Sequence, residues 1–238
     1  MRISKTIAAF GCAVLLSVIG AGAANAVPIQ TFDSGWYQNS GFTAGVNNIN
    51  VGSSNLSGAI YHNWLAFNVN GFGGQTIVSG TLTFYGGNGV NTSSTSETLG
   101  LFDYTGSINT LLADSQNNVG IYTDLGDGSS YGTADVAAGP IQQFSIALSA
   151  AAIANLNAAA HNADTRFVVG GSLLSISGPF ANEQLFAIFG PGTAAVPAAF
   201  LDLQAVPEPS TWAMMLLGLA GVVLAFRRKL KAPTLRFG

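Results

Sequence analysis

Short runs of alternating apolar and polar residues, separated by glycine, asparagine and serine, dominate the middle of this sequence. They lie at residues 63–69, 81–85, 99–101, 119–121, 144–148, 167–169, 185–189 and 200–203. In the first run Leu65, Phe67 and Val69 share one face, and in the second Leu82 and Phe84 do so. Period-two runs bounded by turn residues predict strands. Many short strands in succession predict a mainly β fold, an antiparallel β-sandwich or jelly roll.

One segment of the middle region departs from this pattern. Residues 149–163 are rich in alanine, and Ile153, Leu156 and Ala160 recur at helical spacing. Ser149 precedes them and suits an N-cap, because its hydroxyl can accept a hydrogen bond from a free backbone N–H. We expect one short helix here that covers an end or a face of the sandwich.

The charged residues are distributed unevenly along the chain. Residues 27–205, called the body below, contain ten carboxylates and a single basic residue, Arg166, a net charge of about −9 (one minus ten). One cation cannot neutralise a run of phosphates, which excludes nucleic acid as a partner. We expect Arg166 to pair with Asp164 or Asp202 or to cap the alanine-rich helix. The single cysteine, Cys12, precedes the body, so the body has no disulfide.

The N-terminus has the three ordered parts of a secretory signal. Arg2 and Lys5 supply positive charge, residues 6–20 are apolar, and Ala24 and Ala26 form a small-x-small cleavage site. A membrane anchor is the alternative, but the apolar part is short for a span of about 20 residues. We expect a signal helix, cut by signal peptidase after Ala26.

The C-terminus also has three ordered parts. They are Val206, Pro207, Glu208 and Pro209, then an apolar run at residues 211–226, then Arg227, Arg228 and Lys229. The two prolines fix φ and lack an N–H, so we expect residues 206–209, called the sorting motif below, to be extended and outside any ladder. We expect the apolar run to form a transmembrane helix about 24 Å long. The three basic residues that follow it would then stay on the cytoplasmic side of the membrane.

This tripartite segment resembles the PEP-CTERM sorting signal in its motif, its apolar helix and its basic end. The resemblance covers residues 206–229. It implies recognition by an exosortase, a membrane protease or transpeptidase of bacteria that make exopolysaccharide and biofilm. It further implies export through the inner membrane, transient anchoring by the C-terminal helix, and delivery to the cell surface or the extracellular matrix.

The chain therefore divides into a signal peptide at 1–26, an extracellular β-sandwich domain at 27–205 and a sorting segment at 206–238. Within the body, residues 64–69 and 77–85 together are similar to strand pairs of carbohydrate-binding-like sandwiches. That similarity implies a β-sandwich fold. It also implies sugar binding, as one of the several functions that such a fold can have. Trp36 and Tyr37, flanked by glycine and asparagine, are the candidate sugar-contacting residues.

Candidates for chemistry in the body are few. His62 and His161 are far apart and match no zinc spacing, and residues 128–132 match G-x-S-x-G without the strand–turn–helix context of a nucleophile elbow. Residues 124–128 are similar to part of a calcium loop but have glycine at the third position, so calcium stays an alternative and no other cofactor is expected. The leading hypothesis is a non-enzymatic structural or adhesive protein. A carbohydrate-binding module is the second, and a secreted hydrolase is the third.

Overall fold

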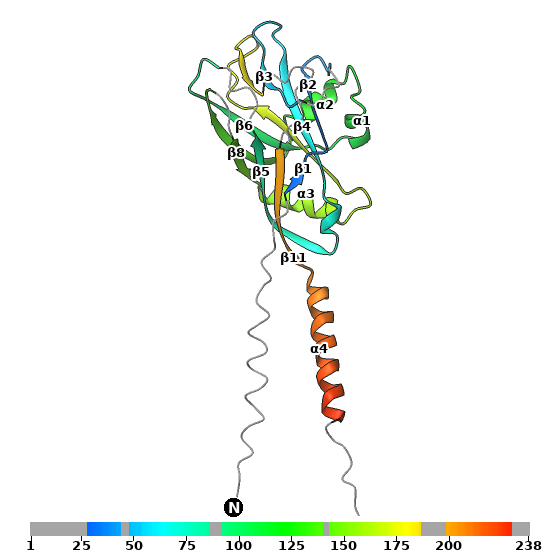
Figure 1. Cartoon of the computed structure of the whole chain (residues 1–238). Coiled ribbons are helices and arrows are strands. Elements are labelled where there is room, and N and C mark those ends of the chain that lie inside the picture. The colour runs from blue at the N-terminus through cyan, green and yellow to red at the C-terminus, as the bar shows by residue number, and fades with distance from the viewer. Residues whose placement is uncertain (1–27, 44–47, 86–91, 140–142, 187–198, 230–238) are drawn as a thin grey trace, which may run out of the picture.

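The computed structural model describes residues 28–43, 48–85, 92–139, 143–186 and 199–229. The predicted signal helix, with Ala24 and Ala26, lies outside these residues. Two antiparallel sheets form the body (Figure 1). The first sheet has the order β1 (Ile29–Gln30), β11 (Ala199–Pro207), β5 (Gln75–Tyr85), β8 (Gln143–Ala147).

The second sheet has seven strands. Six follow the order β10 (Glu183–Leu185), β3 (Val51–Ser53), β4 (Ile60–Asn68), β9 (Arg166–Leu173), β6 (Ser96–Asp103), β7 (Ser130–Ala137). The seventh, β2 (Asp33–Gln38), pairs with β4. The prediction of a mainly β fold with two antiparallel sheets is confirmed.

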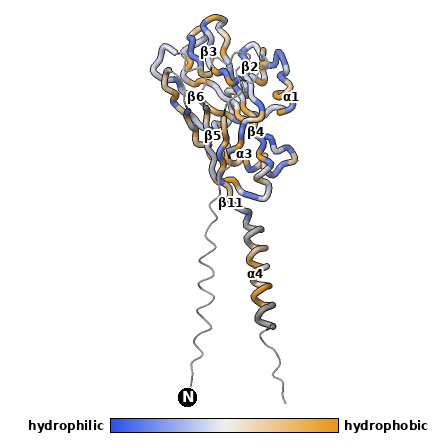
Figure 2. The backbone as a smooth tube through the Cα atoms, viewed as in Figure 1, coloured by the Kyte–Doolittle hydropathy of each residue, from blue (hydrophilic) through white to orange (hydrophobic). Residues whose placement is uncertain are grey.

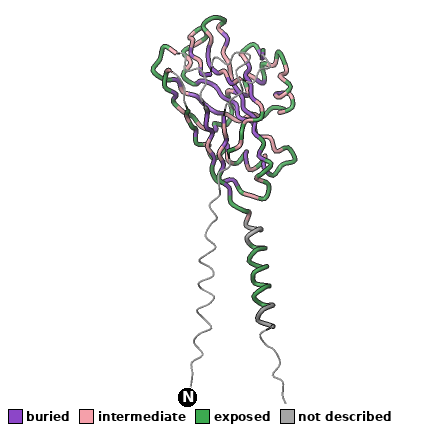
Figure 3. The backbone as a smooth tube through the Cα atoms, viewed as in Figure 1, coloured by how far each residue is buried: buried purple, intermediate pink, exposed green. Residues whose placement is uncertain are grey.

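The main core lies between the two sheets. Leu82, Phe84 and Leu201 contribute to it from the first sheet, and Leu65 and Phe67 contribute to it from the second. The predicted faces of the runs at 63–69 and 81–85 are therefore confirmed. Figure 3 shows buried residues concentrated along these strands, and Figure 2 shows that many of them are hydrophobic.

The predicted association of residues 64–69 with residues 77–85 is wrong in its pairing. Strand β4 pairs with β2, β3 and β9, whereas β5 pairs with β11 and β8 in the other sheet. The short helix η1 (Asn70–Phe72) lies in the connection that takes the chain from one sheet to the other. The apolar faces of the two strands therefore meet across the core instead of side by side in one ladder.

The alanine-rich helix is confirmed as α3 (Ala150–Ala160). The Ser149 side chain caps its N-terminus by accepting a hydrogen bond from the Ala152 N–H at 3.3 Å. Ala152, Leu156 and Ala160 are buried and belong to the main core, against which Ile153 packs from a partly buried position. The helix thus closes one end of the space between the sheets.

A second apolar cluster covers the outer face of the second sheet. Trp64 and Val168 point away from the main core and pack with Leu111 of α1 (Ile108–Leu112) and Ile121 of α2 (Val119–Asp124). The prediction of a strand at residues 119–121 is therefore wrong. Asn118 caps a helix there, with its side-chain oxygen 3.2 Å from the Ile121 N–H.

The C-terminal helix α4 (Pro209–Lys229) is longer at both ends than the predicted helix at 211–226. It extends away from the body, and residues 213–224 are exposed throughout (Figures 1 and 3). Within the described part of the chain, no helix combines the length and the apolarity needed to cross a membrane. The structure therefore confirms a helix over residues 211–226 but not the membrane-spanning part of that prediction.

The core packing makes Phe67 a critical side chain for stability. Its exposed fraction is 0%, and it sits between the two sheets. We expect Phe67→Ala to lower the free energy of unfolding by about 3–5 kcal/mol, because the substitution removes buried apolar surface and leaves a cavity. Urea unfolding of the released protein measures this change. The exposed control Leu56→Ala should change the free energy of unfolding by less than about 0.5 kcal/mol, and an equal effect of both would contradict the described core.

Candidate functional site

The first half of the sorting motif belongs to the sheet. Val206 pairs with Thr76 and Pro207 pairs with Gln75, so β11 runs two residues beyond Ala205. The expectation that the prolines keep the whole motif outside a ladder is therefore wrong. The reason is local: β1 pairs with β11 only at Phe200 and Leu201, so none of the described strands flanks Pro207 on its other side. A proline is tolerated at such an edge because its missing N–H has no partner to lose.

The second half of the motif begins the C-terminal helix. Pro209 is the first residue of α4. Proline suits this position because the first N–H groups of a helix have no intrahelical partner and φ is already set near the helical value. Glu208 thus connects a strand directly to a helix, and its N–H lies 3.4 Å from the Gly74 carbonyl oxygen.

The Glu208 side chain contacts the body through His161. His161 Nε2 lies 2.9 Å from Glu208 Oε1, and His161 Nδ1 lies 2.7 Å from the Asn157 carbonyl oxygen. Both side chains are partly exposed, at 39% for His161 and 37% for Glu208. Since His161 follows the last residue of α3, the helix end places the ring beside the sorting motif. The sequence alone gave no reason to associate these two residues, which are 47 positions apart.

Asn157 fixes the position of this helix end against the sheet. Its side-chain oxygen accepts a hydrogen bond from the Ile77 N–H at 2.8 Å, and its amide donates to the Ile77 carbonyl at 2.8 Å. Strand β8 pairs with β5 only from Thr81 onward, so this stretch of β5 has an open side. The Asn157 amide replaces the missing strand there and holds α3, and with it His161, in register with β5 and β11.

The two histidines have opposite electrostatic environments. The pKa of His161 is raised, chiefly by its hydrogen bond to the Asn157 carbonyl and then by the Glu208 carboxylate. The pKa of His62 is lowered because burial disfavours its charged form, even though the Tyr122 carbonyl lies 2.7 Å from Nδ1. The His62 ring also stacks on Tyr122 with ring centroids 4.0 Å apart. Burial therefore favours the neutral form of His62, and the contacts of the partly exposed His161 favour its charged form.

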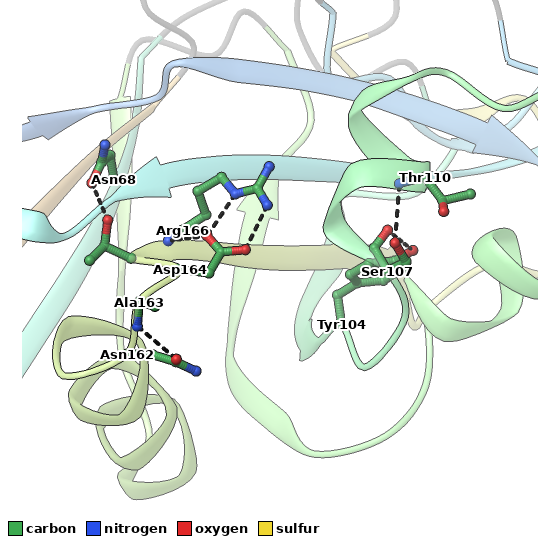
Figure 4. Close-up of polar contacts among 9 residues, drawn as sticks. Asn68, Tyr104, Ser107, Thr110, Asn162, Ala163, Asp164 and Arg166 are labelled. Atoms are coloured by element: carbon green, nitrogen blue, oxygen red, sulfur yellow. Dashed lines mark hydrogen bonds and ion pairs between the residues drawn. The ribbon is translucent and has the colours of Figure 1, made fainter.

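Arg166, the single basic residue of the body, pairs with Asp164 (Figure 4). Its Nε and Nη2 atoms lie 2.7 Å and 2.6 Å from the two carboxylate oxygens. This bidentate hydrogen bonding lowers the pKa of Asp164. Of the partners expected from the sequence, the structure selects Asp164. Asn68 accepts a hydrogen bond from the Thr165 hydroxyl at 2.9 Å.

The candidate sugar-contacting pair is enclosed by the protein. Trp36 is 8% exposed and Tyr37 is 0% exposed, both on β2. Trp36 packs edge-on against Tyr61 with ring centroids 5.0 Å apart. Tyr37 lies in the outer apolar cluster, where burial raises its pKa to about 12. Because other side chains cover β2, neither of these candidate sugar-contacting rings is exposed in the structure.

A shallow open pocket of about 200 Å³ lies beside α1 and α2. It is lined by Tyr104, Ser107, Thr110, Asn118 and Asp124, among others. The Tyr104 hydroxyl donates to the Ser107 carbonyl at 3.3 Å, and the Ser107 hydroxyl accepts from the Thr110 N–H at 3.3 Å (Figure 4). The pocket therefore combines one aromatic ring with hydroxyl, amide and carboxylate groups.

Three carboxylates in or near residues 124–128 accept hydrogen bonds from nearby donors. Asp124 accepts hydrogen bonds from Thr105 and from the Gly106 N–H, Asp103 accepts from the Ser129 N–H, and Asp135 accepts from Thr98. In the described ranges no group of three or more potential metal ligands occurs. The G-x-S-x-G residues precede and enter strand β7, where Tyr131 is buried, so the local order is turn then strand.

Sequence reasoning missed two buried glutamates. Glu97 is 1% exposed and Glu183 is 4% exposed. Glu97 accepts hydrogen bonds from the Thr92 and Ser175 hydroxyls, and Glu183 accepts from the Ser177 N–H at 2.7 Å and its hydroxyl at 2.6 Å. Ser175 and Ser177, in the segment that follows β9, thus donate to one acid each. These two serines were the sequence signal for the buried acids, because a buried carboxylate needs hydrogen-bond donors.

The comparison with protein families agrees with the tripartite segment. The PEP-CTERM protein-sorting motif matches residues 205–229, which include Val206–Pro209 and the basic residues Arg227, Arg228 and Lys229. The match indicates an exported protein that is targeted to an exosortase. The search of curated proteins finds no match for the chain.

The environments of the two histidines predict distinct titrations. We expect an NMR pH titration to place the pKa of His161 above 6.5 and that of His62 below 6.5. The stability that His161 contributes is present below pH 6.5 and is lost as the pH rises through its raised pKa. The stability that depends on neutral His62 is present above pH 6.5 and is lost as the pH falls through its lowered pKa. The chain has two histidines, so His161→Ala assigns both signals, and an inverted order would contradict the described contacts.

Proposed function

We propose that this chain is an exported surface or exopolysaccharide-matrix protein with a structural or adhesive role, delivered by an exosortase. The observation that carries the proposal is the PEP-CTERM match at residues 205–229, which begins where the folded body ends and continues along an exposed helix. In this proposal signal peptidase removes residues 1–26, and the exosortase acts on the sorting segment during a transient association with the membrane.

The composition of the body supports a non-catalytic role. Its net charge of about −9 keeps it soluble and disfavours binding to anionic polymers such as nucleic acid. Asp103, Asp124 and Asp135 accept hydrogen bonds from backbone or hydroxyl donors. These contacts support a body whose polar residues maintain the fold and the surface, and we propose that the protein is not an enzyme.

Carbohydrate binding is a second candidate, favoured by the pocket beside α1 and α2. An aromatic ring next to hydroxyl, amide and carboxylate groups is suited to a sugar, because the ring stacks on its apolar face and the polar groups bond its hydroxyls. The pocket volume of about 200 Å³ is below the roughly 300–1,000 Å³ of ordinary ligand sites. A sugar bound here would therefore be held through a single ring, with low affinity.

The sorting proposal predicts a strong effect of one charge in the motif. We expect Glu208→Ala to lower release of the processed protein about tenfold or more, since a hydrogen bond to a charged group contributes about 1.5–3 kcal/mol to recognition. Immunoblots of membrane and culture-fluid fractions, with intact mass of the released form, measure this effect. Gln204→Ala in the preceding strand β11 is the matched control and should be released normally. Unchanged release of Glu208→Ala would refute exosortase targeting through this motif.

The carbohydrate alternative predicts retention that depends on the pocket. We expect Tyr104→Ala to abolish any slowing of the processed protein in affinity electrophoresis through the exopolysaccharide of the producing cells, because the stacking ring is lost. Leu174→Ala, an exposed change outside the pocket, should leave the retention intact. Absence of retention in the unmodified protein would leave the structural or adhesive role without a sugar-binding component.

A further inference from the structure

The geometry around His161 is satisfied by one protonation state. The Asn157 carbonyl, 2.7 Å from Nδ1, can only accept a hydrogen bond, and an ionised Glu208 carboxylate, 2.9 Å from Nε2, can also only accept. A neutral imidazole donates from one nitrogen, so it leaves one of these contacts without a proton. The imidazolium donates from both nitrogens. The ion pair between His161 and Glu208 therefore requires the protonated ring.

The same contact engages the sorting motif from two directions. Val206 and Pro207 are paired with β5, and the Glu208 N–H approaches the Gly74 carbonyl, so the backbone before Pro209 lies against the body. His161 engages the Glu208 carboxylate from the end of α3. An enzyme that binds an extended peptide uses these same groups, the backbone for register and the side chain for specificity. Binding of the motif to the body and binding to the exosortase are thus in competition.

We propose that His161 is a positioning residue that restrains the sorting motif: it holds Glu208 against the folded body, so that processing by the exosortase is slower while the ion pair is present. This inference rests on the proposed function and adds that a residue of the body regulates the rate of processing. The restraint acts on the substrate and makes no contact with the reacting bond. As the pH rises and His161 loses its proton, the ion pair with Glu208 is lost and processing accelerates.

Few other charged groups lie on the elements around the pair of His161 and Glu208. Helices α3 and η1 contain no ionisable residue, and β5 contains only Tyr85. Asp164, in the segment after α3, is neutralised by Arg166. Asp202 is the remaining acid of β11, and the basic residues of α4 lie in its last turn. The raised pKa of His161 arises from Asn157 and Glu208 and from no other charged group.

The test follows conversion of the full-length chain to its processed form by pulse-chase in cells that contain the exosortase. Because an exposed ion pair is weak, we expect His161→Ala to be processed about two- to fivefold faster than the unmodified chain at pH 6. The unmodified chain should approach the His161→Ala rate at pH 8. His161→Arg keeps its positive charge at both values, so it should stay slow at both. Rates are compared as ratios at each pH, which removes the pH dependence of the exosortase itself.

The controls separate this inference from the proposed function. Asn162→Ala, next to His161, should be processed like the unmodified chain, and thermal unfolding should show that each variant body is folded. If His161→Ala is processed at the unmodified rate or more slowly while Glu208→Ala blocks release, the restraint is overturned and the proposed function stands. If Glu208→Ala has no effect on release, the proposed function itself fails.

Discussion

The antiparallel ladder between β5 and β11 is the interaction on which the rest of the structure depends. It runs from Phe84 opposite Ala199 to Gln75 opposite Pro207, with one register shift next to Ala205. Its inward side chains form one wall of the main core, and its two flanks receive the short strands β1 and β8. The same ladder determines where the sorting motif leaves the fold, because β11 ends inside that motif. The last strand of the body therefore continues into the sorting motif without a linker.

The central strands β4 and β9 of the second sheet are buried on both faces, which explains their composition. Leu65 and Phe67 of β4 face the other sheet, while Trp64 and Ala66 face the helices α1 and α2. A strand covered on both sides needs apolar residues in succession, so the alternation is lost there. Close packing also needs space, and Gly35 supplies it: a Cβ atom at Gly35 would lie 2.8 Å from the Trp64 indole nitrogen. The outer apolar cluster buries Tyr37 of β2, while Trp36 packs against Phe42 and Tyr61.

Local patterns predicted the local structure well. The periodicity of residues 81–85 and 200–203 gave the strands and their buried faces, and Ser149 marked the start of α3, because these features depend on neighbours in the chain. Pairing between strands was not predictable, since β4 and β5 are adjacent in sequence but belong to different sheets. The three-part C-terminus was recognisable because its chemistry is linear. The contact of Glu208 with His161 was not, because it depends on how Asn157 fixes the end of α3 to β5.

Strand β11 runs into the sorting motif without a spacer, and this has a mechanical consequence. Whatever is attached to the chain near Glu208 is joined to a strand that is hydrogen-bonded along its length to β5. Tension applied there acts along β11, perpendicular to its hydrogen bonds, so the whole ladder resists in shear and does not open one bond at a time. A protein fixed at this end to a surface would bear load through its sheet and would stand directly at its point of attachment.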